Sequence, residues 1–186
     1  MQFGSFLDCL EQNPVIAAIG DDKWDAAIAS PAKVLFYLSA DIMTVSQRIR
    51  QAHDANKIVF VHADLSEGIG KDRAGIRFLV QSGVDGIIST KAQLIRFAKE
   101  QGILTVQRFF TLDSKGMESM EDILRSTNPH TMELMPGVIG KTIARFSKGN
   151  VPVIAGGLIQ TKAEVMDALG CGAAAVSTGQ KELWYI

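Results

Sequence analysis

The sequence predicts an all-parallel α/β fold, a small TIM-type (β/α)8 barrel with a reduced last helix. Eight short apolar runs alternate with segments of helical periodicity, at roughly 23 residues per unit. The runs have aliphatic interiors, while polar residues gather at their ends, as in parallel strands buried on both faces. At 186 residues the chain is shorter than the usual minimum of about 200 for this fold, so its helices must be short.

The predicted strands are the apolar runs bounded by turn residues: 14–20, 33–39, 57–65, 85–90, 103–110, 131–136, 151–157 and 173–179. Predicted helices cover 44–56, 72–81, 91–101, 119–125, 140–146 and 161–172, with shorter ones around Trp24 to Ile28 and at 180–184. Residues 3–10 form an amphipathic helix that stops at Asn13-Pro14 and serves as a plug or flank. We therefore expect a single barrel domain over 1–186, with 1–13 as a short flanking helix.

The amino-acid composition and net charge exclude few classes of protein function. Hydrophobic residues make up 47% and charged residues 21%, which suits a compact soluble protein, and the net charge of −1 neither favours nor excludes nucleic acid. Cys9 and Cys171 have no paired spacing and indicate free thiols in a reducing compartment. Without a signal peptide or an apolar run of about 20 residues, a cytoplasmic protein with no membrane contact is expected.

A phosphate site is predicted where the last two strands end. Parallel strands joined by a right-handed crossover present their carboxyl-end turns on one side. The first turn carries glycines that let the backbone approach an anion, and the second adds hydroxyl donors. A short helix over 180–184 would point its amino terminus at the same place, although Gly-Gly also occurs in ordinary turns. The candidate phosphate ligands are Gly156, Gly157, Ser177, Thr178 and Gly179.

Four other polar residues at strand ends form a second candidate group. His62 and Asp64 point to one face of their strand, which suits an acid–base pair, a metal pair or simple hydrogen bonding in the barrel mouth. Two ligands without a third do not make a metal site. Arg108 and Glu133 lie on adjacent strands and either pair with each other or recognise ligand hydroxyls. Next to a phosphate, the four suit a small polyol phosphate.

The remaining candidates are basic. Lys71 and Arg73 lie in a long loop over 66–73, where they either close over an anion or are merely solvated. Lys141, Arg145 and Lys148 form a stripe on one predicted helix, and Arg96 and Lys99 form a smaller patch on another. Such stripes are usually the wet outer faces of barrel helices, but two of them merged in a dimer would make a basic surface of RNA size.

The short carboxyl-terminal segment predicts an uncovered flank. Only residues 180–186 follow the eighth strand, too few for a full helix. Apolar surface between the last and first strands would then be exposed unless the amino-terminal helix or another subunit covers it. A homo-oligomer is expected on this ground.

Several segments together resemble the glycerol uptake operon antiterminator family, the glycerol-3-phosphate-responsive regulators of bacteria. They are residues 62–72 (HADLSEGIGKD), 85–91 (DGIISTK), 107–114 (QRFFTLDS), 133–137 (ELMPG) and 155–159 (AGGLI), and the match runs from about Pro14 to Trp184. The resemblance implies a barrel that binds glycerol 3-phosphate as effector, without a cofactor. It also implies binding of the leader of a messenger RNA, so that transcription passes a terminator in glycerol uptake and metabolism genes.

The resemblance places phosphate and glycerol at the two groups of strand-end residues above, but it does not locate the RNA surface. No catalytic or metal-binding residues are assigned. The alternative is a TIM-barrel enzyme, an isomerase, aldolase or lyase acting on a small phosphorylated substrate, because this fold hosts many such reactions. Against an enzyme stand the absence of a strand-end lysine and of a complete metal triad.

Overall fold

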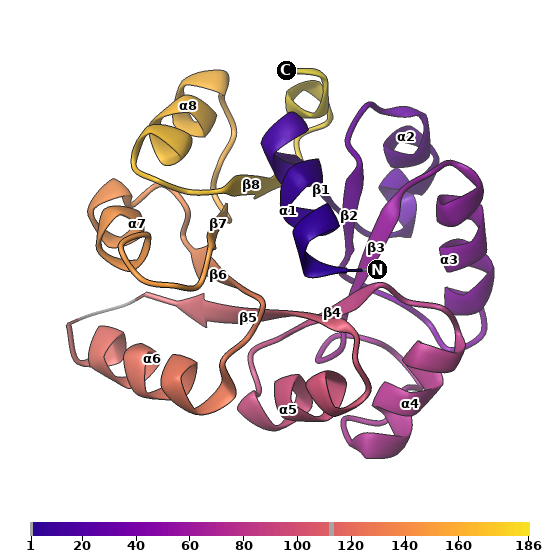
Figure 1. Cartoon of the computed structure of the whole chain (residues 1–186). Coiled ribbons are helices and arrows are strands. Elements are labelled where there is room, and N and C mark those ends of the chain that lie inside the picture. The colour runs from indigo at the N-terminus through magenta and orange to yellow at the C-terminus, as the bar shows by residue number, and fades with distance from the viewer. Residues whose placement is uncertain (1, 112–113) are drawn as a thin grey trace.

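The computed structural model describes residues 2–111 and 114–186. Met1 and residues 112–113, which belong to the segment 107–114 quoted for the family resemblance, lie outside the described part. Within that part, eight parallel strands pair in chain order and close into a barrel (Figure 1). They are β1 (Val15–Ile19), β2 (Val34–Tyr37), β3 (Ile58–His62), β4 (Gly86–Ser89), β5 (Leu104–Phe110), β6 (Thr131–Met135), β7 (Val153–Gly156) and β8 (Ala175–Thr178). The closing pair sets Ile16 of β1 opposite Ser177 of β8. The predicted fold class is confirmed.

Helices surround the barrel: α1 (Phe3–Gln12), η1 (Asp21–Lys23), α2 (Trp24–Ala29), α3 (Val45–Asp54), α4 (Arg73–Gln81), α5 (Ala92–Glu100), α6 (Ser114–Thr127), α7 (Gly140–Phe146), α8 (Lys162–Gly170) and η2 (Lys181–Tyr185). The helix predicted over 119–125 is longer in the structure, because Met117 extends its apolar stripe toward the amino terminus. Thr161 begins α8 with a capping box, in which Glu164 returns the hydrogen bond.

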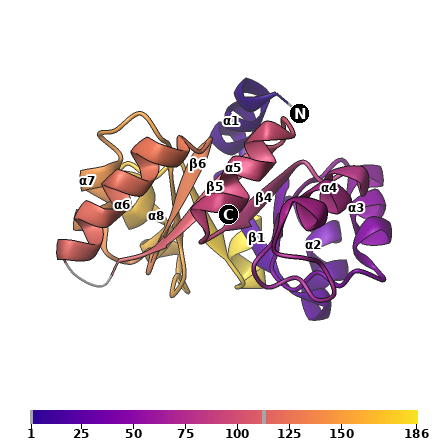
Figure 2. The same cartoon turned by 90° about the horizontal axis from the view of Figure 1, so that it is seen from below.

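Helix α1 closes the amino-terminal end of the barrel. Phe6 and Leu10 join the apolar cluster inside the barrel, which includes Ile16 and Val34 near the starts of their strands. The Phe6 ring lies 5.0 Å from that of Phe60, and α1 stands across this end in both views (Figures 1 and 2). Of the two roles predicted for this helix, the structure shows the plug. The polar residues predicted at the strand ends lie at the opposite, carboxyl-terminal end of the barrel.

The flank expected to be bare is covered by η2. Leu183 and Trp184 are buried there, and η2 packs against β1 and α2. The Trp184 Nε1 atom also donates a hydrogen bond to the Thr178 carbonyl oxygen at 2.9 Å. The short helix η2, with its two large buried side chains, therefore takes the place of the full helix that would follow β8 in a complete barrel. The homo-oligomer, which was expected because of this flank, stays a prediction. No described helix has the length and apolarity needed to span a bilayer.

Candidate functional site

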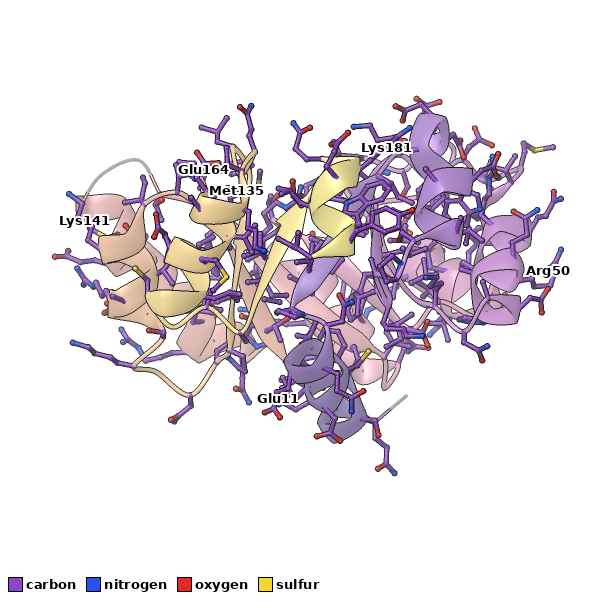
Figure 3. All side chains as sticks on the ribbon, turned by 90° about the horizontal axis from the view of Figure 1, so that it is seen from above. Glu11, Arg50, Met135, Lys141, Glu164 and Lys181 are labelled. Atoms are coloured by element: carbon purple, nitrogen blue, oxygen red, sulfur yellow. The ribbon has the colours of Figure 1, made fainter. Side chains whose placement is uncertain are left out.

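A pocket of about 410 Å3 opens at the carboxyl ends of the strands. It is lined by residues 20, 22 and 23 after β1, by residues 157–160 after β7 and by residues 177–180 at and after the end of β8, and side chains of β5 and β6 complete it. In Figure 3, the labelled Met135 and Lys181 lie at this end, and Glu11 of the plugging helix lies at the other. The pocket therefore lies where a (β/α)8 barrel carries its function.

A buried ion pair forms part of the pocket lining. Arg108 and Glu133 face each other on β5 and β6, and the Arg108 Nε atom donates to Glu133 Oε2 at 2.6 Å. Their side chains are only 8% and 1% exposed. The pairing considered from the sequence is thus present, and both residues still line the pocket. A buried pair of this kind holds a fixed charge pattern ready for a polar ligand.

Ser177 completes this network from β8. Its Oγ atom donates to Glu133 Oε1 at 2.5 Å, so each carboxylate oxygen has a donor. A Cβ atom on Gly156 would overlap both Glu133 Oε1 and Ser177 Oγ. Glycine at position 156 is therefore needed to make room for the Glu133 carboxylate. Gly156 itself, predicted as a phosphate ligand, does not line the pocket. We call Arg108, Glu133 and Ser177 the floor network.

Gly157 forms the turn after β7. Its φ of +77° lies in the left-handed region, which favours glycine, and a Cβ atom there would lie 2.7 Å from Met135 Cε. The Gly137 amide donates to the Gly157 carbonyl oxygen at 3.1 Å, which ties this turn to the end of β6. Gly157 lines the pocket, and its contact with a phosphate stays a prediction.

Thr178 joins the loops around the pocket. Its Oγ1 atom donates to the Ile159 carbonyl oxygen at 2.9 Å and accepts from the Gln180 amide at 3.1 Å. Carbonyl and carboxylate oxygens only accept hydrogen bonds, so the hydroxyl protons of Thr178 and Ser177 are both directed at protein acceptors. Both residues line the pocket. In this structure, however, neither hydroxyl is left to donate to an anion.

Lys23 is a pocket residue that the sequence analysis missed. It lies in η1, beyond the end of β1, and its Nζ atom donates to the Gly179 carbonyl oxygen at 2.8 Å. The sequence prediction took only the last residues of each strand as candidates. Lys23 lies four residues past the end of β1 and so was not among them. Asp22 of the same turn also lines the pocket. A half-buried ammonium group at the rim is the charge that an anionic ligand needs.

His62 and Asp64, predicted at the glycerol end, do not line this pocket. His62 is 3% exposed, and burial, followed by the nearby Arg108, lowers its pKa from 6.5 to about 4. Its Nδ1 atom has no hydrogen-bond partner among the described residues. The histidine is therefore neutral near pH 7 and is buried close to Arg108.

Asp64 connects β3 to the turn after β4. It accepts hydrogen bonds from Ser89 Oγ at 2.7 Å and from the Thr90 amide and hydroxyl at 2.7 and 2.8 Å. Burial raises the pKa of Asp64, but the bonds from Thr90 and Ser89 outweigh it and hold the pKa below its usual value. The carboxylate is thus occupied by loop contacts.

The predicted closing loop also lies away from the pocket. Lys71 donates to the Ser66 carbonyl oxygen within the loop, and burial lowers the pKa of its ammonium group. Arg73, at the start of α4, pairs with Glu100 and lies 4.2 Å from the centre of the Phe97 ring. Neither basic residue lines the pocket, so this structure places no closing group from the loop over it.

Two residues of the predicted basic stripe, Lys141 and Arg145, lie on α7, whereas Lys148 lies beyond the end of this helix at Phe146. Lys141, Arg145 and Lys148 are all exposed, and Arg145 pairs with Glu121 of α6 at 2.8 Å. Among the described residues, no group of three or more His, Cys, Asp or Glu side chains is placed to hold a metal ion. Chemically, the pocket offers a rim cation, two glycine turns and a buried charged floor.

The comparison with protein families decides the assignment. A family model described as glycerol-3-phosphate responsive antiterminator matches residues 15–184. The chain belongs to this antiterminator family. An uncharacterized protein of Escherichia coli (strain K12), YgcP, is 34% identical over 181 residues, which cover 96% of this chain and 95% of that protein.

Solved structures support the same family. A glycerol uptake operon antiterminator regulatory protein from Listeria monocytogenes is 32% identical, with a TM-score of 0.86 over 91% of this chain and 94% of that one. An antiterminator-related protein from Thermotoga maritima is 33% identical, with a TM-score of 0.84 over 92% and 98%. The aldolase QR15 is 10% identical, with a TM-score of 0.74 over 94% of this chain and 93% of that one, and shows the fold alone. The antiterminator family is one of regulators rather than enzymes.

Proposed function

We propose that the pocket binds glycerol 3-phosphate and that the loaded protein binds the leader of a messenger RNA, so that transcription passes a terminator. The genes controlled would be those of glycerol uptake and metabolism, and the protein would act in the cytoplasm, without a resident cofactor. Membership of the antiterminator family supports the effector. The observation that carries the proposal is the combination, in one pocket, of a cation at the rim and a charged floor.

The geometry favours one orientation of the ligand. Ser177 and Thr178 have already directed their protons to protein acceptors, so these hydroxyls are suited to accept hydrogen bonds rather than to donate to phosphate. A glycerol hydroxyl donates to such groups and accepts from the Arg108 guanidinium. We therefore place the glycerol hydroxyls at the floor network and the phosphate at the rim, near Lys23 and the backbone of Gly157.

In this orientation Lys23 exchanges one partner for another. In the structure its ammonium group donates to the Gly179 carbonyl oxygen, a neutral acceptor. A phosphate dianion at the same distance is a stronger acceptor, because both groups are charged. Release of Gly179 would loosen the turn after β8 from the turn after β1. A ligand shifts the protein toward an RNA-binding form only by the difference in its affinity for the two forms.

Calorimetry tests the first half of the proposal. Glycerol 3-phosphate should bind the wild type, while glycerol and inorganic phosphate should bind far more weakly. Replacement of Lys23 by Met should weaken glycerol 3-phosphate at least tenfold and leave glycerol unchanged, because only the phosphate loses a partner. Lys162→Met, at an exposed position on α8, is the matched control and should bind like the wild type. Equal binding of inorganic phosphate and glycerol 3-phosphate would contradict the proposal.

Gel-shift assays test the second half. A transcript of the leader upstream of a glycerol gene should bind the protein more tightly with glycerol 3-phosphate present than without it. If calorimetry shows that the ligand binds but RNA affinity does not change, the proposal that the protein senses glycerol 3-phosphate would stand. The proposal that it is an antiterminator would be rejected. A turnover assay on the bound glycerol 3-phosphate, followed by phosphorus NMR, should show an unchanged ligand.

A further inference from the structure

Basic residues from three helices gather around the last turns of α6. Arg96 of α5 donates to Ser126 Oγ at 3.1 Å, and Lys99 of α5 donates to the Thr127 carbonyl oxygen at 3.2 Å. On the other side of α6, Arg145 of α7 donates to Glu121 at 2.8 Å. The two basic patches that look separate in the sequence are therefore parts of one surface, on either side of α6.

A groove of about 350 Å3 lies within this surface, between α6 and α7. Its polar lining residues are Glu121, Arg125, Asn128, Arg145 and Asn150, and its apolar ones include Leu124 and Phe146. The two asparagine amides both donate and accept hydrogen bonds, as the edge of a nucleobase requires. An arginine guanidinium plane can stack on a base or hold a phosphate. The groove thus has the size and chemistry for a nucleotide.

Charge on this surface favours a polyanion. Its described part carries five cations, at positions 96, 99, 125, 145 and 148. One acid, Glu121, lines the groove and pairs with Arg145, and the neighbouring Asp122 pairs with Arg125. All four of these side chains are at least 40% exposed, so their pairs are weak and easily exchanged for contacts with phosphate. Helix-dipole stabilisation explains a cation in the last turn of α6 but not the groove with its two amides.

We propose that this groove, formed by residues 121–128 and 145–151, is where the protein contacts single-stranded RNA. Arg125 and Arg145 hold phosphates on either side of a nucleotide whose base meets Asn128 and Asn150. This inference rests on the proposed function, since it supplies the surface for the RNA. The groove and the pocket lie at opposite ends of β7: residues 147–151 lead into the amino end of this strand, and Gly157 of the pocket follows its carboxyl end.

The test compares two double variants with the same change of charge. Arg125→Gln with Arg145→Gln removes the groove cations. Arg50→Gln with Arg77→Gln removes two exposed cations from α3 and α4, which lie on the other side of the barrel (Figure 1). Figure 3 shows Arg50 at the far side of the molecule from Lys141 of α7. The probe is a pool of random 40-nucleotide RNAs, enriched on the wild-type protein with glycerol 3-phosphate present, and filter binding is measured over a range of salt.

The groove variant should lower the slope of log affinity against log salt by about 1.4, since each phosphate contact to a single strand contributes about 0.7. At 0.15 M salt this corresponds to roughly tenfold weaker binding, while the control variant and the calorimetric affinity for glycerol 3-phosphate stay unchanged. A wild-type salt slope in the groove variant, or an equal loss of RNA affinity in both variants, would overturn the proposal that RNA binds in the groove and would leave the proposed function in place. Failure of any RNA to enrich on the wild type, with glycerol 3-phosphate still bound, would overturn the antiterminator proposal as well.

Discussion

Replacement of Glu133 by Gln tests the floor network directly. The substitution keeps the size of the side chain and removes its charge. Arg108 would remain 8% exposed without the carboxylate that its Nε atom contacts at 2.6 Å, and Gln offers a single carbonyl oxygen where Ser177 and Arg108 now each have one. An NH2 group would also be forced toward one of these two donors.

The expected loss is large because the pair is buried. Removal of one partner from a buried ion pair costs about 3–5 kcal/mol, and the oxygen that Gln retains places this case near the lower end, at about 3 kcal/mol. For a protein of this size, 1 kcal/mol shifts the melting temperature by about 2–4 °C, so we expect a decrease of roughly 6–12 °C. The matched control is Glu121→Gln, which breaks the exposed pair with Arg145 and should cost less than about 1 kcal/mol.

Urea unfolding at pH 7.5 measures both variants, with calorimetry for glycerol 3-phosphate. Glu133→Gln should lose stability and ligand affinity together, whereas Glu121→Gln should lose less than about 1 kcal/mol of stability and keep its ligand affinity. Replacement of both members by apolar residues, Arg108→Met with Glu133→Leu, should be less destabilising than Glu133→Gln alone, since no unpaired charge is left buried. Equal losses in Glu133→Gln and Glu121→Gln would refute the argument that burial makes this pair strong.

Three further outcomes follow from the structure. Phe6→Ala should lower the free energy of unfolding by about 3–5 kcal/mol in urea, because the plug loses its contact with Phe60; a loss under 1 kcal/mol would contradict the plug. Gly157→Ala should weaken glycerol 3-phosphate, since φ is +77° and Met135 Cε would lie 2.7 Å from the new Cβ; unchanged calorimetric affinity would exclude this turn from the site. The wild type should lose up to about 3 kcal/mol as pH falls from 6.5 to 4, where the unfolded chain protonates His62 and the native one does not. His62→Gln should flatten this part of the stability profile, and an identical profile in both proteins would show that another group is responsible.

The strands could be predicted from the sequence because all eight have the same pattern in a closed parallel barrel. Each needs a short apolar run with turn residues at its ends, and the run over 131–136 becomes β6 at Thr131–Met135. The amphipathic helices follow similarly, as in α7, whose bounds match the predicted 140–146. Helix α6 was underestimated because Gly116, a poor helix former, lies in its first turns.

The pocket was only partly predictable. Its glycine turns and the pairing of Arg108 with Glu133 follow from strand order, which the sequence indicates well. The directions of the Ser177 and Thr178 hydroxyl protons do not, since they depend on which acceptors three-dimensional packing brings within reach. Lys23 was missed for a related reason. Its ammonium group contacts Gly179, 156 residues along the chain, and no local pattern encodes such a contact.

The position of α1 has a consequence for the order of folding. Phe6 and Leu10 dock into a cluster that includes Ala175 of β8, so their binding surface is complete only when β8 has joined β1. Contacts between residues so far apart in the chain form late, because the entropy of closing the intervening loop must be overcome first. A nascent chain would therefore carry an exposed apolar helix while most of the barrel is still being made. Folding of this protein should depend on chaperones more than its small size suggests.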